Sequence, residues 1–137
     1  MVQSLAKYKT ASCFKFNYND SLSKECNAPK DKSGVYLIYA DKELIYIGRS
    51  GRKDKNGNIK HRKDGLYGRF VKGKQFGDRR TKTWPAKIKE EGIKEFSVHW
   101  FVTYDDIYKD FPDEIEYRLI NEYKKQFGNI PRWNNKG

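Results

Sequence analysis

The sequence has few of the residues that build disulfide scaffolds or metal clusters. Its 137 residues include two cysteines, Cys13 and Cys26, and two histidines, His61 and His99. Two cysteines are too few for the disulfide framework of a small secreted protein, and no C-x-x-C spacing indicates a zinc site. We therefore expect two reduced thiols in a cytoplasmic protein and a structural role for His99 in a strand.

Long apolar segments are also missing. No run approaches the roughly 18 apolar residues that a membrane-spanning helix needs. The opening segment, MVQSLAKYKTASCF, lacks the apolar stretch of a secretion signal. Because no long basic amphipathic helix is present either, we expect no membrane as a partner.

Aliphatic residues are scarce, and aromatic residues compensate for them. Leucine, isoleucine, valine and phenylalanine make up about 21% of the chain, close to the roughly 20% below which highly charged chains tend to stay disordered. The chain also has 3 Trp, 10 Tyr and 8 Phe, and each large ring can bury about 150–250 Å². We predict one folded domain with a thin, tyrosine-rich core.

Acidic residues are the minority, and the positive charge is concentrated in one segment. The net charge is +11, and residues 49–74 hold ten basic and only two acidic side chains. Such a patch attracts polyanions, nucleic acid first, because each neutralised phosphate releases counterions. The predicted nucleic-acid-binding residues are Arg49, Arg52, Lys60, Arg62, Lys72 and Lys74, and the nearby basic residues Arg79, Arg80 and Lys82 extend the patch.

The acidic residues gather in a second segment. Residues 105–116 contain six carboxylates and one lysine. An acidic cluster in a basic protein is a plausible place for a cation. Acids before a helix also stabilise its positive end, which is the simpler interpretation.

Hydrophobic periodicity predicts alternating strands and helices. We expect strands over 14–18, 35–40, 43–49 and 95–104, a tight turn at 41–42, a basic loop or flap over 52–63, and helices over 65–73, from Pro85 to about 92, and over 112–127. This order predicts an α+β domain with a small, mostly antiparallel sheet covered by helices. The irregular tail carries Trp133, which we expect to pack back onto the domain.

Two glycine–tyrosine triplets lie on the predicted hairpin. They are Gly34-Val35-Tyr36 and Tyr46-Ile47-Gly48. This pair resembles the GIY-YIG nuclease family, whose triplets lie on the first two strands of a three-stranded antiparallel sheet. The resemblance implies a small three-stranded sheet flanked by helices over 34–137, with residues 1–33 as an N-terminal extension packing on that domain.

Three further features continue the resemblance, which spans roughly residues 34–134. Arg69 in Leu-Tyr-Gly-Arg-Phe matches the family's helical arginine. Glu116 lies in a Glu-x-x-Leu-Ile pattern that matches its metal-binding glutamate, and Asn134 follows a proline and an aromatic residue as the family's asparagine does. One triplet alone is weak evidence, since a tyrosine in a strand usually belongs to the core.

The resemblance implies a metal-dependent endonuclease that hydrolyses DNA phosphodiester bonds and leaves RNA open as a substrate. Glu116 would bind Mg²⁺ or Mn²⁺, which keeps several waters and needs few protein ligands. Arg69 would clamp the phosphate, Tyr36 would act as general base with Tyr46 beside it, and Gly34 and Gly48 would have structural roles. Asn134 would orient a DNA strand or support the site by hydrogen bonds.

The sequence departs from the family pattern at Gly73, where many members carry histidine or tyrosine. Lys60 and His61 are candidates to replace that residue, and Tyr67 is a weaker one. Tyr36, Tyr46 and His61 all remain possible general bases.

The metal ligand, the asparagine and the function itself each have a second candidate. Glu114 competes with Glu116 as the ligand, and Asn135 competes with Asn134. A non-catalytic nucleic-acid binding module on the same scaffold is the alternative function. The sequence leaves the oligomeric state open.

Overall fold

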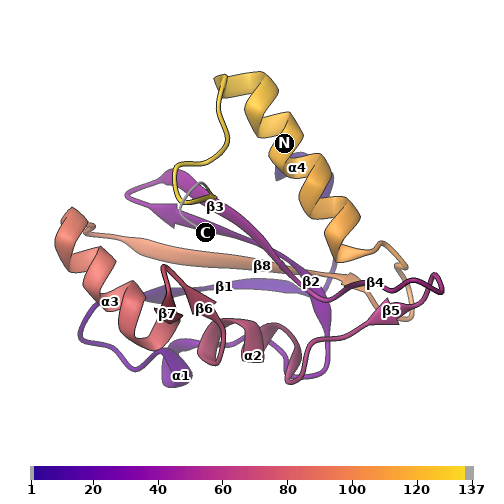
Figure 1. Cartoon of the computed structure of the whole chain (residues 1–137), viewed down its shortest axis with the longest axis horizontal. Helices are drawn as coiled ribbons and strands as arrows, with labels where there is room; N and C mark the ends of the chain where they lie inside the picture. The colour runs from indigo at the N-terminus through magenta and orange to yellow at the C-terminus, as the bar shows by residue number, and fades with distance from the viewer. Residues whose placement is uncertain (1, 135–137) are drawn as a thin grey trace.

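The computed structural model describes residues 2–134. Its centre is a four-stranded antiparallel sheet in the order β1-β8-β2-β3, as Figure 1 shows. The strands are β1 (Ala11–Phe16), β2 (Ser33–Ala40), β3 (Glu43–Ser50) and β8 (Phe96–Tyr104). The α+β class follows the prediction from sequence.

The prediction of three strands is wrong, because β1 adds a fourth. It pairs with β8 from Ala11 opposite Phe101 to Phe16 opposite Phe96. Phe14 and Phe16 point into the core, while the residues between and before them stay exposed. A strand with one apolar face needs both a backbone partner and a surface to cover, and the edge of β8 offers both. The N-terminal segment, which also holds η1 (Val2–Leu5) and α1 (Leu22–Glu25), is therefore part of the sheet architecture.

The predicted turn between β2 and β3 is confirmed. Asp41 and Lys42 have φ angles of 50° and 72°, as in the two-residue turns whose twist matches that of the flanking strands. The Asp41 carboxylate accepts hydrogen bonds from the backbone N–H groups of Lys94 and Glu95, at 3.0 and 2.8 Å. This fixes the turn and places the two triplets on neighbouring strands.

Helices cover both faces of the sheet (Figure 1). α2 (Gly65–Val71) and α3 (Arg80–Glu91) cover one face, whose core includes Phe70, Trp84 and Trp133. α4 (Pro112–Phe127) covers the other through Ile115 and Leu119. Two short hairpins complete the fold, β4 (Arg52–Lys53) with β5 (Ile59–Lys60) and β6 (Lys74–Gln75) with β7 (Asp78–Arg79).

The predicted bounds of α4 are confirmed, whereas the predicted start of α3 is wrong. α3 begins at Arg80, and Pro85 is its sixth residue. Arg80, Trp84 and Ile88 are its buried residues, and their spacing of four places them on one helical face. This buried face stabilises the earlier turn, although Pro85 removes one backbone donor from the helix.

Within residues 2–134, no helix has the length and apolar character needed to cross a membrane. Cys13 is exposed, Cys26 is buried, and both are free. His99 is half-buried on β8 and packs edge-on against Tyr39, with ring centroids 5.0 Å apart.

Candidate functional site

A basic cavity of about 460 Å³ opens where β3 ends. β3, the β4–β5 hairpin, α2 and α4 all contribute to its walls. The lining residues are Arg49, Ser50, Gly51, Arg52, Lys60, His61, Arg62, Arg69 and Glu116. Five of these are cations and one is a carboxylate, so the cavity is suited to an anion. Seven of them are site residues predicted from the sequence, and the fold brings these seven together.

Glu116 projects from the first half of α4 and is held by Arg49. The Arg49 Nε donates a hydrogen bond to Glu116 Oε1 at 3.1 Å, and its Nη1 donates to the carbonyl oxygen of Gly51 at 3.1 Å. Only 24% of the Glu116 side chain is exposed. Burial raises the pKa of Glu116, and Arg49 offsets part of that rise. The carboxylate is thus partly desolvated and already paired with one cation.

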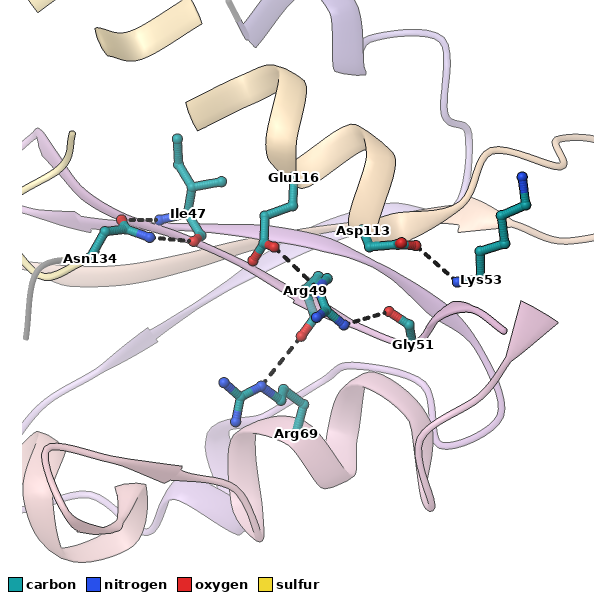
Figure 2. Close-up of polar contacts among 8 residues, drawn as sticks. All are labelled: Ile47, Arg49, Gly51, Lys53, Arg69, Asp113, Glu116 and Asn134. Carbon is teal, nitrogen blue, oxygen red and sulfur yellow. Dashed lines mark hydrogen bonds and ion pairs between the residues drawn. The ribbon is translucent and has the colours of Figure 1, made fainter. Parts of the chain in front are cut away.

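Arg69 and Arg62 bring further positive charge to the cavity. Figure 2 shows Arg49 between Glu116 and Arg69, whose Nε donates to the Arg49 carbonyl oxygen at 3.3 Å. The pKa of Arg69 is raised, mainly by the nearby Tyr36 and to a lesser extent by Tyr46 and Glu116. Burial acts in the opposite direction and lowers it less. Burial and the nearby Arg69 lower the pKa of Arg62. In the described part of the chain neither Arg62 nor Arg69 forms a salt bridge, so no carboxylate neutralises either guanidinium group.

Tyr36 and Tyr46 pack side by side next to Arg69, with ring centroids 6.0 Å apart. Neither lines the basic cavity, and Tyr36 is fully buried, with 0% of its surface exposed. The pKa of Tyr46 is raised to about 12, first by the proximity of Tyr36 and second by burial. Tyr46 therefore keeps its proton at neutral pH and can donate a hydrogen bond.

The two predicted structural glycines each allow a close approach. A Cβ atom at Gly34 would lie 1.8 Å from the Phe101 carbonyl oxygen on β8. At Gly48 it would lie 2.4 Å from Cζ of Tyr36. Real side chains do not tolerate such distances, so glycine is required where β2 meets β8 and where Tyr36 lies against β3.

Arg80 is the main residue that sequence reasoning placed incorrectly. The sequence interpretation grouped it with a surface patch, whereas it is fully buried, at 0% exposure. Its guanidinium donates to the Tyr36 hydroxyl at 2.7 Å, to Gln75 Oε1 at 3.1 Å and to the Arg69 carbonyl oxygen at 3.1 Å. It also lies 5.1 Å from the Trp84 ring centroid. Its spacing of four from Trp84 is the sequence signal for this position, and the misplaced start of α3 concealed it.

His61 lies on the cavity wall and is oriented by a serine that sequence reasoning missed. Its Nδ1 is 2.6 Å from Oγ of Ser33, which is fully buried at the start of β2. This hydrogen bond occupies Nδ1 and leaves Nε2 for a ligand. Lys60 also lines the cavity, whereas Tyr67 does not and instead packs beneath Lys30 Nζ, 4.7 Å from its ring centroid.

The structure also explains the missing side chain at Gly73. A Cβ there would lie 2.1 Å from the Arg69 carbonyl oxygen. Any larger residue would displace the backbone of α2 at the arginine that faces the cavity. A histidine or tyrosine at this position is therefore incompatible with the local fold.

Three predicted nucleic-acid-binding residues lie outside the basic cavity. Lys72 pairs with Asp64 at 2.6 Å, and Lys74 is exposed at the start of β6. The Asn134 amide donates to the Ile47 carbonyl oxygen at 2.9 Å and accepts from the Ile47 N–H at 3.0 Å. Asn134 thus pairs with the edge of β3 as a neighbouring strand would (Figure 2). The competing Asn135 lies outside the described residues.

Among the carboxylates near the cavity, Glu116 is the candidate ligand for a metal ion. Residues 2–134 contain no group of three or more His, Cys, Asp and Glu side chains that could hold a metal. Asp113 accepts the Lys53 backbone N–H at 2.9 Å, and Glu114 pairs with Lys53 Nζ at 3.7 Å and does not line the cavity. Glu116 alone fits a hard, largely hydrated dication such as Mg²⁺ or Mn²⁺, which must share this carboxylate with Arg49.

Comparisons with protein-family models, with curated proteins and with solved structures gave no match.

Proposed function

We propose that this protein is a metal-dependent endonuclease of the GIY-YIG type, which hydrolyses DNA phosphodiester bonds in the basic cavity. The observation that carries the proposal is a single, partly buried carboxylate, Glu116, on the wall of a cavity with five cations. A module that only binds nucleic acid has no need of a carboxylate beside the phosphates, because the negative carboxylate repels the negative phosphates. A hydrolytic site does need one.

Arg69 and Arg62 are assigned to the phosphate. A guanidinium group keeps its charge throughout the usable pH range and offers paired N–H donors to phosphate oxygens. The bond from Arg69 Nε to the Arg49 carbonyl fixes one arginine before substrate arrives. Donors that are already in place stabilise the charge that develops in the transition state without reorganising.

His61 is the general base that the geometry favours over the two tyrosines. It lines the cavity, whereas Tyr36 is buried and its hydroxyl accepts a hydrogen bond from Arg80. When the N–H of His61 lies at Nδ1 and donates a hydrogen bond to Ser33 Oγ, Nε2 is free to accept a proton from the attacking water. Tyr36 and Tyr46 then act by holding Arg69 in place.

A dication at Glu116, Mg²⁺ or Mn²⁺, would offset negative charge on the phosphate and on the leaving oxygen. Glu116 would supply the protein ligand, and the carboxylate would be shared with the Arg49 guanidinium that already pairs with it. With a dication at Glu116, the net charge of the cavity would stay favourable to DNA.

The decisive experiment compares Glu116→Gln with the matched control Glu114→Gln. Plasmid is incubated with each protein and Mg²⁺, with EDTA as the blank, and nicked and linear products are measured. We expect Glu116→Gln to lose at least about 100-fold in rate, while DNA binding is kept or becomes tighter because one negative charge is removed. Glu114→Gln should cut normally. Wild-type rates for Glu116→Gln would overturn the assignment, and loss of activity only in Glu114→Gln would move the metal to Glu114.

The alternative is a non-catalytic nucleic-acid binding module, favoured by the salt bridge between Glu116 and Arg49. Such a module would bind duplex, branched or single-stranded DNA in a salt-dependent way and leave all of them intact. Intact substrates with Mg²⁺, Mn²⁺ and Co²⁺, together with measurable binding, would establish this alternative.

A further inference from the structure

The β4–β5 hairpin projects from the side of the molecule beyond the end of β3 (Figure 1). Its two strands pair only with each other, with Arg52 opposite Lys60 and Lys53 opposite Ile59. Both Arg52 and Lys60 are exposed. The hairpin is therefore a separate two-stranded ribbon attached to the wall of the basic cavity.

The paired cations on this ribbon attract an anion and do not stabilise the strand pair. Like charges directly opposite each other destabilise a strand pair, and neither Arg52 nor Lys60 has a salt bridge within residues 2–134. The same two residues line the basic cavity and a smaller groove beside Lys55 and Asn56 at the hairpin tip. Positive charge thus extends from the cavity to the tip, where the smaller groove is also lined by the Asp54 carboxylate.

The base of the hairpin is fastened to α4. The Lys53 backbone N–H donates to Asp113 at 2.9 Å (Figure 2), and its Nζ lies 3.7 Å from Glu114 and 5.2 Å from the Phe111 ring centroid. These contacts fix the direction in which the ribbon leaves the domain. They also engage the acidic start of α4 in holding the hairpin.

The tip of the hairpin is ordered by its own aspartate. The Asp54 carboxylate accepts the backbone N–H groups of Asn56 and Asn58 at 2.8 and 2.9 Å. Lys55, Asn56 and Asn58 present exposed side chains. Preorganised segments lose less entropy on binding, so the tip is prepared for a defined partner surface.

We propose that the β4–β5 hairpin enters the major groove of duplex DNA and reads base edges with Asn56 and Lys55. The proposal rests on the proposed function only in placing the backbone phosphate in the basic cavity. The major groove of B-form DNA, about 12 Å wide, admits a two-stranded ribbon. Asparagine pairs with two atoms of adenine there, and lysine contacts guanine. The deep, narrow major groove of duplex RNA excludes such a ribbon, so the partner is duplex DNA.

The test measures binding in EDTA, so that it does not depend on cleavage. A pool of duplexes with a randomised segment is incubated with the protein, and the bound fraction is sequenced. We expect the wild type to select particular bases at one or two positions, and Asn56→Ala to relax that selection about 5- to 100-fold at one of them. The control Asn19→Ala, an exposed asparagine outside the hairpin, should keep the wild-type selection.

Two outcomes overturn the proposal: unchanged base selection by Asn56→Ala and by Lys55→Ala, or equal affinity for duplex RNA and duplex DNA of one sequence. Wild-type unfolding curves for both variants show that the fold is intact. Cleavage without hairpin-dependent selection would remove this inference and keep the nuclease. Selection without cleavage would keep the hairpin's role and remove the nuclease.

Discussion

Arg80 and Arg52 carry the same guanidinium group in opposite surroundings. Arg80 is fully buried and donates to three neutral oxygens, one of them the Tyr36 hydroxyl. Arg52 is exposed, lies opposite Lys60, and donates to the Lys53 carbonyl oxygen at 3.3 Å. The buried guanidinium organises its neighbours because its many donors must be satisfied. The exposed one has charge available for a ligand.

Arg49 and Arg69 join these two regions. Arg80 bonds to the carbonyl of Arg69, and Arg69 bonds to that of Arg49, whose side chain reaches Glu116. The interior arginine therefore fixes the backbone from which cavity arginines extend. We expect changes in the interior to affect stability and geometry together, and changes on the hairpin to affect binding alone.

The largest expected effect is that of Arg80→Leu. The change leaves the Arg69 carbonyl oxygen and the Tyr36 hydroxyl without their partner in a buried layer, which costs about 2–4 kcal/mol of unfolding free energy. Urea denaturation measures this loss. Arg52→Gln serves as the matched control and should stay within about 0.5 kcal/mol of the wild type. Equal stability of all three proteins would show that Arg80 does not organise the interior.

The second prediction concerns Tyr46 at high pH. Its folded-state pKa of about 12 lies above the ordinary 10.0, so the folded chain holds the phenolic proton more tightly than the unfolded chain does. The stabilisation of the folded state that results from this raised pKa is complete below pH 10 and is lost as the pH rises to about 12. We expect Tyr46→Phe to flatten the fall in unfolding free energy over that range by about 1–3 kcal/mol. An identical slope in the variant would contradict the assignment.

The third prediction separates Arg49 from its salt bridge. Arg49→Gln removes the cation that competes for Glu116, and a partly exposed ion pair is worth up to about 1 kcal/mol. Mn²⁺ should therefore bind about three- to fivefold more tightly, as measured by electron paramagnetic resonance of the free ion. Lys72→Gln, which removes a salt bridge outside the cavity, should leave Mn²⁺ affinity unchanged. Weaker Mn²⁺ binding by Arg49→Gln would place the metal elsewhere.

The smallest expected effect is that of Lys60→Gln on the salt dependence of DNA binding. Each phosphate contact contributes about 0.9 to the slope of log affinity against log salt concentration. Loss of one contact from the hairpin should reduce the slope by about that amount, with no change in unfolding free energy. Fluorescence anisotropy over a salt series measures it. The same slope in variant and wild type would mean that Lys60 faces no phosphate.

Local sequence signals predicted much of the fold. The turn at 41–42 and the bounds of α4 follow from hydrophobic periodicity and from residues that start or stop an element. The charge count over 49–74 likewise indicated the segment that supplies most of the basic cavity. Each of these depends on neighbours in the chain, and such preferences act over a few residues.

Contacts between distant segments decided the rest. The pairing of β1 with β8, the burial of Arg80 against Tyr36 and the hold of Arg49 on Glu116 join residues 44 to 90 positions apart. No local pattern specifies whether a charged side chain faces water or an interior oxygen, because the partner comes from another part of the chain. Local patterns were enough to predict most of the long elements and the sign of the charge, whereas contacts between distant segments set which charges are buried and which are free to meet a ligand.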